Sequence, residues 1–460
     1  MIKLHVNHSH QIDMLHGSLL DKILIFALPL AISTILQQLF NSADVAVVGR
    51  FESSQALAAV GSNGAAINLM LNLFVGLSVG ANVVVASYIG QQEPGKVREA
   101  VHTVVSLAIL SGFLLLAWGL AMARPLLLVM STPEDVMDLS VLYLRIYFLG
   151  MPFIMLYNFG SAILRSMGDS RRPLWCLLVS GVINVILNLI LVIVFRLGVA
   201  GVAIATVIAN AISAVMVVYY LMNEEDPFRL DWGRLSLKRE HLMRVLRVGL
   251  PAGVQGTLFS ISNMCIQATV NGFGSLASAG SAAALNFDII TFYIVNAFTQ
   301  AAVTFTSQNY GAGNAGRCKR VLTLTMAASL FFTGLACLAC FVWRREILSV
   351  YTVDPVALSF GEVRMIHAVA FIWLCSTYEI TGSAMRGMGY PMLPTVLVLL
   401  GCCVLRLVWI YAVFPFWGTF ASLMDIYPIT WIVTGIATNF AYCRVRRKAF
   451  ARLEVSASSM

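Results

Sequence analysis

Twelve long apolar stretches constrain the fold of this chain more than any other feature of its sequence. They lie at residues 23–48, 57–87, 100–122, 137–160, 174–195, 200–222, 246–270, 280–307, 321–343, 360–384, 393–415 and 423–443. A helix needs about 20 apolar residues to cross the hydrocarbon core of a bilayer, and every stretch reaches that length. Only 11 % of the residues are charged, whereas soluble domains average about 25 %. The sequence therefore predicts an all-α polytopic membrane protein with twelve transmembrane helices.

Lysine and arginine are distributed unevenly among the segments that connect these stretches. They concentrate after the even-numbered stretches, for example at Lys96, Arg172 and Lys319, and again after the last one, from Arg444 to Arg452. Basic loops stay on the cytoplasmic side of a membrane, so both termini are expected to be cytoplasmic. The net charge of +8 follows from the same loops, and it gives no reason to expect a nucleic-acid partner.

The two halves of the chain repeat one another. Leu28-Pro29 and Asn41 recur 222 residues later as Leu250-Pro251 and Asn263. Two further sets recur with a shift of 221 residues: Gly90, Gly95, Arg165, Gly168 and Pro173 match Gly311, Gly316, Arg386, Gly389 and Pro394. An even number of stretches separates equivalent positions, so both halves have the same orientation in the membrane. We therefore expect two six-helix lobes related by a pseudo-two-fold axis along the membrane normal, with a cavity between them.

The polar segments set the expected boundaries of the domains. Residues 1–21 form a cytoplasmic N-terminal segment, 22–222 the N-lobe, 223–245 a cytoplasmic linker, 246–443 the C-lobe and 444–460 a basic cytoplasmic tail. His5, His8 and His10 could bind a metal, but a solvated terminus is the simpler interpretation. The acidic run from Glu224 to Asp226 could be taken for the metal site of a membrane transferase, but a solvated connector explains a single run better.

Several motifs resemble those of the multidrug and toxic compound extrusion (MATE) family. They are the Leu-Pro pairs that open spans one and seven, Asn-Ser-Ala-Asp at 41–44, Leu-Arg-Ser-Met-Gly-Asp at 164–169, Gln-Asn-Tyr-Gly-Ala-Gly at 308–313, and Met-Arg-Gly-Met-Gly-Tyr at 385–390. The resemblance covers nearly the whole chain. Within the family, the chain resembles the bacterial, DinF-like branch most, because Asp288 places an acidic residue in span eight. The resemblance implies a multi-pass protein of the bacterial inner membrane that exports organic, often cationic, compounds by antiport against protons or sodium.

Asp44 is the candidate coupling residue because a carboxylate within a membrane span needs a partner or a water-filled cavity. Asn184 and Asn188 are four residues apart and therefore share one helix face. In related MATE proteins the residues that match Asp44 and Asn184 help to form a cation or proton site, and some relatives have a second Asp where this chain has Asn188. Asn41 and Thr206 add oxygen atoms, and Na⁺ is a possible ligand. The alternatives are that Asp44 is a boundary residue and that the two asparagines only join helices.

A second group of charged residues lies in the C-terminal half. Asp288 in span eight, Glu379 in span ten and Arg406 in span eleven are expected to form a charge cluster. Arg406 requires compensation in an apolar span, and Glu379 or Asp288 would supply it most simply. The excess acid could attract a cationic substrate or accept a proton. A fixed ion pair that only joins the three spans is the structural alternative.

Aromatic and methionine side chains are weaker candidates for a substrate cavity. Aromatic faces attract organic cations, and flexible methionines suit varied ligands. The candidates are Phe287, Phe292, Tyr293, Tyr378, Met70 and Met155. Most such residues in a membrane protein only pack against lipid or other helices.

The sequence thus predicts a secondary active efflux transporter rather than an enzyme. It needs no cofactor beyond the coupling ion, and its partners are small organic substrates and the lipid bilayer; we expect a monomer. No glycine loop of the kind that binds ATP phosphates is present. The alternatives are a lipid or glycolipid flippase of the wider superfamily, a membrane transferase and a passive channel.

Overall fold

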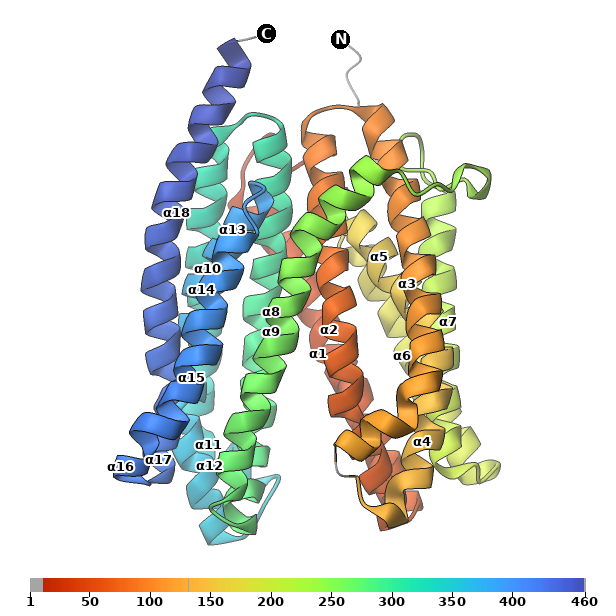
Figure 1. Cartoon of the computed structure of the whole chain (residues 1–460), viewed down its shortest axis with the longest axis vertical. Coiled ribbons are helices and arrows are strands. Elements are labelled where there is room, and N and C mark those ends of the chain that lie inside the picture. Colours follow the sequence, from red (N-terminus) through yellow and green to blue (C-terminus); the bar gives the residue numbers. More distant parts are fainter. Residues whose placement is uncertain (1–10, 131, 459–460) are drawn as a thin grey trace. The chain divides into compact units, whose positions relative to one another are not determined.

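The computed structural model describes residues 11–130 and 132–458, and these residues fold into helices joined by short connections (Figure 1). No strand occurs in the described ranges. His5, His8 and His10 lie outside them. The predicted all-α class is confirmed.

The chain divides into two compact units, of which the first comprises the residues up to Ile67 together with Val84–Arg244. Its helical elements are α1 (Leu20–Phe51), both ends of α2 (Ser54–Gly90), α3 (Pro94–Val129), α4 (Glu134–Leu149), α5 (Met151–Ser166), α6 (Arg171–Leu189), the π-helical turn η1 (Ile190–Val194), α7 (Gly198–Met222) and the 3₁₀ turn η2 (Trp232–Arg234). Long helices dominate this unit because its apolar stretches contain few helix breakers.

The second unit comprises Asn68–Val83 and Val245–Met460. Its helical elements are α8 (Arg239–Asn271), α9 (Ser275–Gly311), α10 (Ala315–Val342), α11 (Arg344–Ser349), α12 (Pro355–His367), η3 (Val369–Leu374), α13 (Cys375–Gly387), α14 (Met392–Val398), η4 (Leu399–Val404), α15 (Leu405–Val408), η5 (Trp409–Val413), α16 (Phe414–Trp417), α17 (Phe420–Met424) and α18 (Ile426–Ser458). The first turns of α8 belong to the first unit. Helical segments α12 to α13 and α14 to α16 each form one predicted span.

Each of the twelve predicted stretches coincides with a helix or a helical run. Ten of the described helices are long and apolar enough to cross a membrane, and α4 with α5 makes an eleventh that bends by 47°. The bend falls where Gly150 precedes a proline in the first turn of α5. In the twelfth, α8, polar residues such as Gln255 and Asn263 interrupt the apolar sequence.

Glycines explain why the middle of α2 belongs to the second unit. A Cβ atom on Gly76 would lie 2.1 Å from the backbone nitrogen of Gly253, and one on Gly80 would lie 2.7 Å from that of Gly249. The two helices therefore cross in backbone contact, in an antiparallel sense. We call these four residues the glycine seam. Small residues spaced by four allow this close approach in membrane helices.

Hydrogen bonds flank the seam and hold the same pair of neighbours. Asn72 donates to the Ser260 hydroxyl over 2.9 Å, and the Thr304 hydroxyl donates to Asn82 over 3.0 Å. Residues 68–83 of α2 thus contact the backbone of α8 and form side-chain hydrogen bonds with both α8 and α9.

The predicted linker is shorter and more tightly bound than the sequence suggested. Helix α8 begins at Arg239, and Glu224 is only 8 % exposed. Arg172 donates to both Asp169 and Glu224, so the three side chains form a buried ion triad. The interpretation of the whole acidic run as a solvated connector is therefore wrong for Glu224, because it overlooked a basic partner in the preceding loop.

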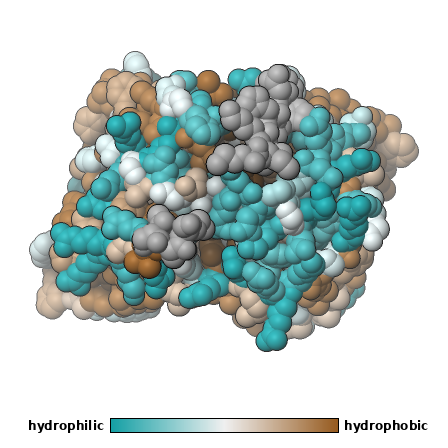
Figure 2. All heavy atoms as spheres, turned by 90° about the horizontal axis from the view of Figure 1, so that it is seen from above, coloured by the Kyte–Doolittle hydropathy of each residue, from teal (hydrophilic) through white to brown (hydrophobic). Residues whose placement is uncertain are grey.

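Hydrophilic residues gather on the face that is seen in Figure 2, and hydrophobic residues are more frequent toward its edge. This distribution suits a protein whose sides face lipid and whose ends face water. The multi-pass arrangement predicted from the sequence agrees with it.

Candidate functional site

The candidate coupling site surrounds Asp44 in the last third of α1. The side chain is 7 % exposed and faces the neighbouring helices α6 and α7. Asn188 donates an amide hydrogen to one carboxylate oxygen of Asp44. The Thr206 hydroxyl lies 3.5 Å from the other carboxylate oxygen. Three helices thus converge on one acid.

The two asparagines owe their positions to the regular geometry of α6. Asn184 and Asn188 are one turn apart, and Asn188 donates to the Asn184 carbonyl oxygen over 3.2 Å. Asn184 in turn donates to the Thr206 hydroxyl over 3.4 Å. The structure therefore brings together four of the five residues that the sequence singled out for this site.

One oxygen atom in this cluster has an unused acceptor capacity. The Asn188 side-chain oxygen is buried and accepts no hydrogen bond among the described contacts. A buried acceptor without a donor is energetically costly, so such an atom suggests a bound water, proton or cation. All hydrogen-bond acceptors in this cluster are oxygen atoms, from the side chains of Asp44, Asn184, Asn188 and Thr206. Hard cations prefer oxygen ligands, so the set suits such a cation.

Asn41 is the one predicted member that lies apart. Its side chain is exposed, and none of the described hydrogen bonds joins it to Asp44. Residues three apart are neighbours on a helix surface, yet Asp44 is buried against α6 and α7 whereas Asn41 is exposed. The spacing that placed Asn41 near the site was therefore insufficient evidence for contact.

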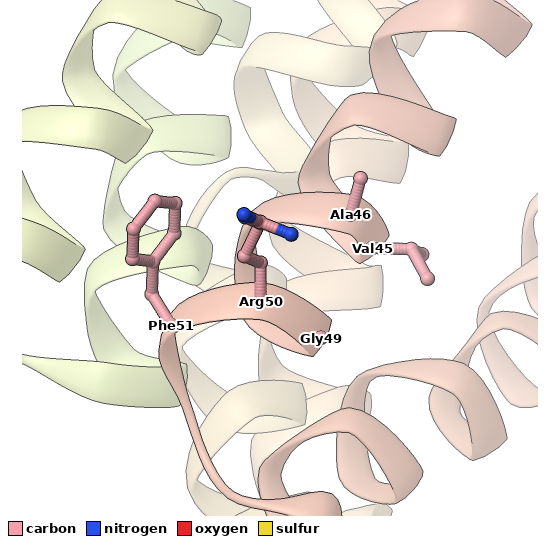
Figure 3. A pocket seen from close by; sticks show the side chains of 5 residues that line it. All are labelled: Val45, Ala46, Gly49, Arg50 and Phe51. Atoms are coloured by element: carbon pink, nitrogen blue, oxygen red, sulfur yellow. The ribbon is translucent and has the colours of Figure 1, made fainter.

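A hollow of about 770 Å³ lies against the last turns of α1, directly after Asp44. Val45, Ala46, Gly49, Arg50 and Phe51 line it (Figure 3). Figure 3 shows the Arg50 side chain projecting from the helix between Phe51 and Ala46. Asp44 thus immediately precedes Val45, the first residue that lines this hollow, although the Asp44 side chain is turned toward α6 and α7.

The predicted charge cluster in the C-terminal half is arranged differently from the expectation. Asp288 on α9 pairs with Arg364 on α12, whose Nε and Nη2 atoms lie 2.8 and 2.5 Å from the same carboxylate oxygen. Arg364 also donates to the Ser281 hydroxyl over 2.9 Å. Sequence reasoning missed Arg364, although a basic residue inside span ten was a signal as strong as Arg406 in span eleven.

Arg406 is fully buried, and none of the ion pairs between described residues includes it. Its Nη1 atom donates to Asn263 over 2.9 Å, and its Nε atom lies 3.5 Å from the Thr430 hydroxyl. The guanidinium stacks between the rings of Phe259 and Tyr427, at 5.0 and 4.9 Å from their centroids. The prediction that Asp288 or Glu379 forms an ion pair with Arg406 is therefore wrong, since amide, hydroxyl and aromatic groups surround it instead.

Glu379 is the third member of the predicted cluster. Its side chain is partly exposed, and the described hydrogen bonds and ion pairs do not include it. It precedes Arg386 by two turns on α13, and Arg386 donates to Gln255 over 2.6 Å. The structure therefore divides the expected triad into an ion pair, a stacked arginine and a separate carboxylate.

The predicted cavity residues differ widely in burial. Met155 and Tyr378 are fully buried and Met70 is 8 % exposed, so these three pack within their units. Phe287 and Phe292 are partly buried against the core of the second unit, and Tyr293 is also partly buried. A role in substrate binding stays a prediction for all six.

Comparison with known proteins identifies the family. The sequence profile of the MatE family matches residues 29–190 and again 251–412. The chain belongs to the MATE family. The two matches begin 222 residues apart, which is the register of the internal repeat. The duplication inferred from scattered motifs therefore coincides with two copies of one family unit.

Relatives and solved structures agree with this membership. The chain is 28 % identical to the probable multidrug resistance protein YoeA of Bacillus subtilis over 81 % of its own length and 82 % of that protein. It superposes with a TM-score of 0.86 on a MOP superfamily transporter from Pyrococcus furiosus, at 21 % identity, covering 96 % of this chain and 98 % of the other. An outward-facing multidrug resistance MATE transporter gives a TM-score of 0.84 at 21 % identity, over 96 and 97 % of the two chains. The twelve-helix, two-lobed MATE fold predicted from the sequence is confirmed.

The two repeats of this MATE chain carry different chemistry at equivalent positions. Ile266 stands where the first repeat has Asp44, and it is 1 % exposed in an apolar core. A carboxylate in an oxygen-lined cluster thus occurs in the first unit, and its counterpart in the second unit is a packing residue. Duplication supplied the scaffold, and the polar substitutions distinguish the two halves.

Proposed function

We propose that this MATE transporter exports small organic compounds by secondary active antiport, with Asp44 as the residue that exchanges the coupling cation. The observation that carries the proposal is a single buried carboxylate whose two described hydrogen bonds come from neutral donors, an amide and a hydroxyl. Among the residues that the structure describes, no ion pair joins it to a guanidinium or ammonium group. Its charge is therefore available to a proton or a monovalent cation.

The residues around Asp44 define what the site would do in each state. In the charged state the Asn188 amide donates to the carboxylate and compensates part of its charge. The oxygens of Asn184, Asn188 and Thr206 would surround Na⁺ if sodium is the coupling ion, whereas protonation of Asp44 would neutralise the site without further ligands. Either event removes one negative charge from the interior of the first unit.

A change of one buried charge is large enough to bias a conformational equilibrium. A cation bound about 4 Å from the Asp44 carboxylate would interact with it by about 4 kcal/mol at an effective dielectric constant of 20, which is comparable to the few kcal/mol that commonly separate two conformers. Binding of the cation would thus shift the population of the transporter between its outward-open and inward-open states. Substrate release on one side and cation release on the other would complete the cycle.

The names of the relatives support a class of substrate. Proteins similar to this chain are named multidrug resistance or multidrug export proteins, among them MepA of Staphylococcus aureus. We propose organic, often cationic, compounds for this chain as well, exported across a bacterial inner membrane. The charge bias of the loops supports cytoplasmic termini.

A binding experiment on purified protein tests the proposal. A fluorescent organic cation is added to the transporter in weakly buffered detergent solution, with and without sodium, and the release of protons is followed. Wild-type protein is expected to release protons on binding the dye, or to bind it with an affinity that depends on sodium. Asp44→Asn is expected to bind the dye with neither effect. Binding by the wild type that is indifferent to both cations would exclude coupled antiport through this site.

A further inference from the structure

One face of α18 continues from an apolar surface into a basic one. Val433, Ile436 and Phe440 are 46, 68 and 61 % exposed, and they recur at intervals of three and four residues. Arg444 and Arg447 extend the same spacing and are exposed as well. Residues at such intervals lie one above another on a helix, so the five side chains form a single stripe along α18.

The opposite face of α18 is packed against its own unit, which holds the stripe in a fixed direction. Tyr442, Val445, Ala449 and Phe450 belong to a buried cluster with residues of α10 and α13. The Tyr310 hydroxyl donates to the Ala449 carbonyl oxygen over 3.3 Å. Figure 1 shows α18 as one continuous helix up to its C-terminal end. The basic residues therefore stand on a rigid helix rather than on a flexible tail.

The basic half of the stripe lacks acidic neighbours. No aspartate or glutamate occurs between Asp425 and Glu454, and Lys448 adds a further exposed charge beside Arg444. Among the described residues, none of the ion pairs includes Arg444, Arg447 or Lys448. The Arg444 guanidinium lies 4.6 Å from the centroid of the Phe440 ring, at the point where the apolar half of the stripe ends.

We propose that this stripe binds an anionic phospholipid. The acyl chains would lie along Val433, Ile436 and Phe440, which are exposed on the predicted membrane span 423–443. The headgroup phosphate would then meet Arg444 and Arg447, which lie about 6 and about 10.5 Å beyond Phe440 along a helix that rises about 1.5 Å per residue. Guanidinium groups recognise phosphate oxygens through charged, often paired hydrogen bonds.

The charge and the apolar surface together favour a lipid over a soluble phosphate compound. A free anion would use only the arginines, whereas a phospholipid uses both halves of the stripe. Each basic residue near a membrane surface strengthens binding of anionic lipid by about 1 kcal/mol, or about fivefold. Loss of both arginines is thus expected to weaken the preference for anionic over neutral lipid by about 25-fold.

Native mass spectrometry of the full-length transporter, with phosphatidylglycerol and phosphatidylcholine in competition, tests the proposal. Wild-type protein should retain phosphatidylglycerol preferentially, Arg444→Gln/Arg447→Gln should lose most of this preference, and Arg444→Lys/Arg447→Lys should keep most of it. Arg229→Gln/Arg239→Gln is the matched control, because it removes the same charge from exposed positions near the start of α8.

Three results would overturn the proposal. They are an equal affinity of the wild type for both lipids, an unchanged preference in Arg444→Gln/Arg447→Gln, and an equal loss in the control variant. Glycerol 3-phosphate is added as a soluble competitor in a separate arm. Displacement of the lipid by this compound at millimolar concentration would show that the arginines form a phosphate site rather than a lipid site. Melting temperatures of all variants confirm that each one is folded.

Discussion

Replacing Arg364 by methionine removes the partner of Asp288 while it preserves much of the side-chain volume. Two of the three guanidinium contacts go to one carboxylate oxygen, at 2.8 and 2.5 Å, and the arginine is only 3 % exposed. Hydrogen bonds to charged groups contribute about 1.5–3 kcal/mol each, and breaking one side of a buried pair costs about 3–5 kcal/mol. We expect Arg364→Met to lower the free energy of unfolding by about 3–5 kcal/mol.

A thermal-melting series in detergent measures this loss. For a unit of about 200 residues, each kcal/mol shifts the melting temperature by about 2–4 °C, so the single variant should melt about 6–20 °C lower. Asp288→Asn/Arg364→Met removes both charges and should recover a large part of the loss. Arg406→Met should cost distinctly less than Arg364→Met, because the described ion pairs and hydrogen bonds do not join Arg406 to a carboxylate. An unchanged melting temperature of Arg364→Met, or no recovery in the double variant, would refute the reasoning.

Two further predictions concern the helix crossing and the topology. Gly253→Ala places a methyl group against the backbone of α2 and should destabilise the protein by about 1–3 kcal/mol. Gly334→Ala is the control: no atom of a neighbouring segment lies within 4 Å of the new carbon, so the substitution should be neutral or stabilising. Equal melting temperatures of the two variants would contradict the close packing at the glycine seam. Single cysteines at Lys96 and Lys319 in a cysteine-free background should react in intact cells only with membrane-permeant reagents, and labelling by an impermeant reagent would reverse the proposed orientation.

The fold was predictable because hydropathy reports directly on the span of a bilayer. Twelve stretches and one repeat register were sufficient for the helices and their number. Local irregularities were less accessible: the break at Gly150 falls inside an apolar run, and residues 68–83 of α2 join the second unit through the glycine seam. Such features depend on which faces of two helices meet, and composition alone does not specify this.

The candidate site was likewise predictable from the sequence only in part. Asn184 and Asn188 share a face by spacing alone, and the pairing of Asp44 with Asn184 followed from the family resemblance. Thr206 was predicted only as a further oxygen in span six, and the structure places it beside Asp44 and Asn184. The partner of Asp288 was not predictable in this way, because spans ten and eleven both contain basic residues and the rotations of the helices decide which of them faces Asp288. Arg364, rather than Arg406, is turned toward Asp288.

The central claim is that the charge of Asp44 couples transport to a cation gradient. Asp44→Asn and Asp21→Asn make the same substitution in α1, one in the buried cluster and one at an exposed position of the first turn. Reconstituted into vesicles, Asp21→Asn is expected to export a fluorescent organic cation in response to an imposed proton or sodium gradient as the wild type does. Asp44→Asn, folded to the same melting temperature, is expected to show no gradient-driven export. Export at the wild-type rate by Asp44→Asn would contradict the account and make Asp44 a residue of helix packing.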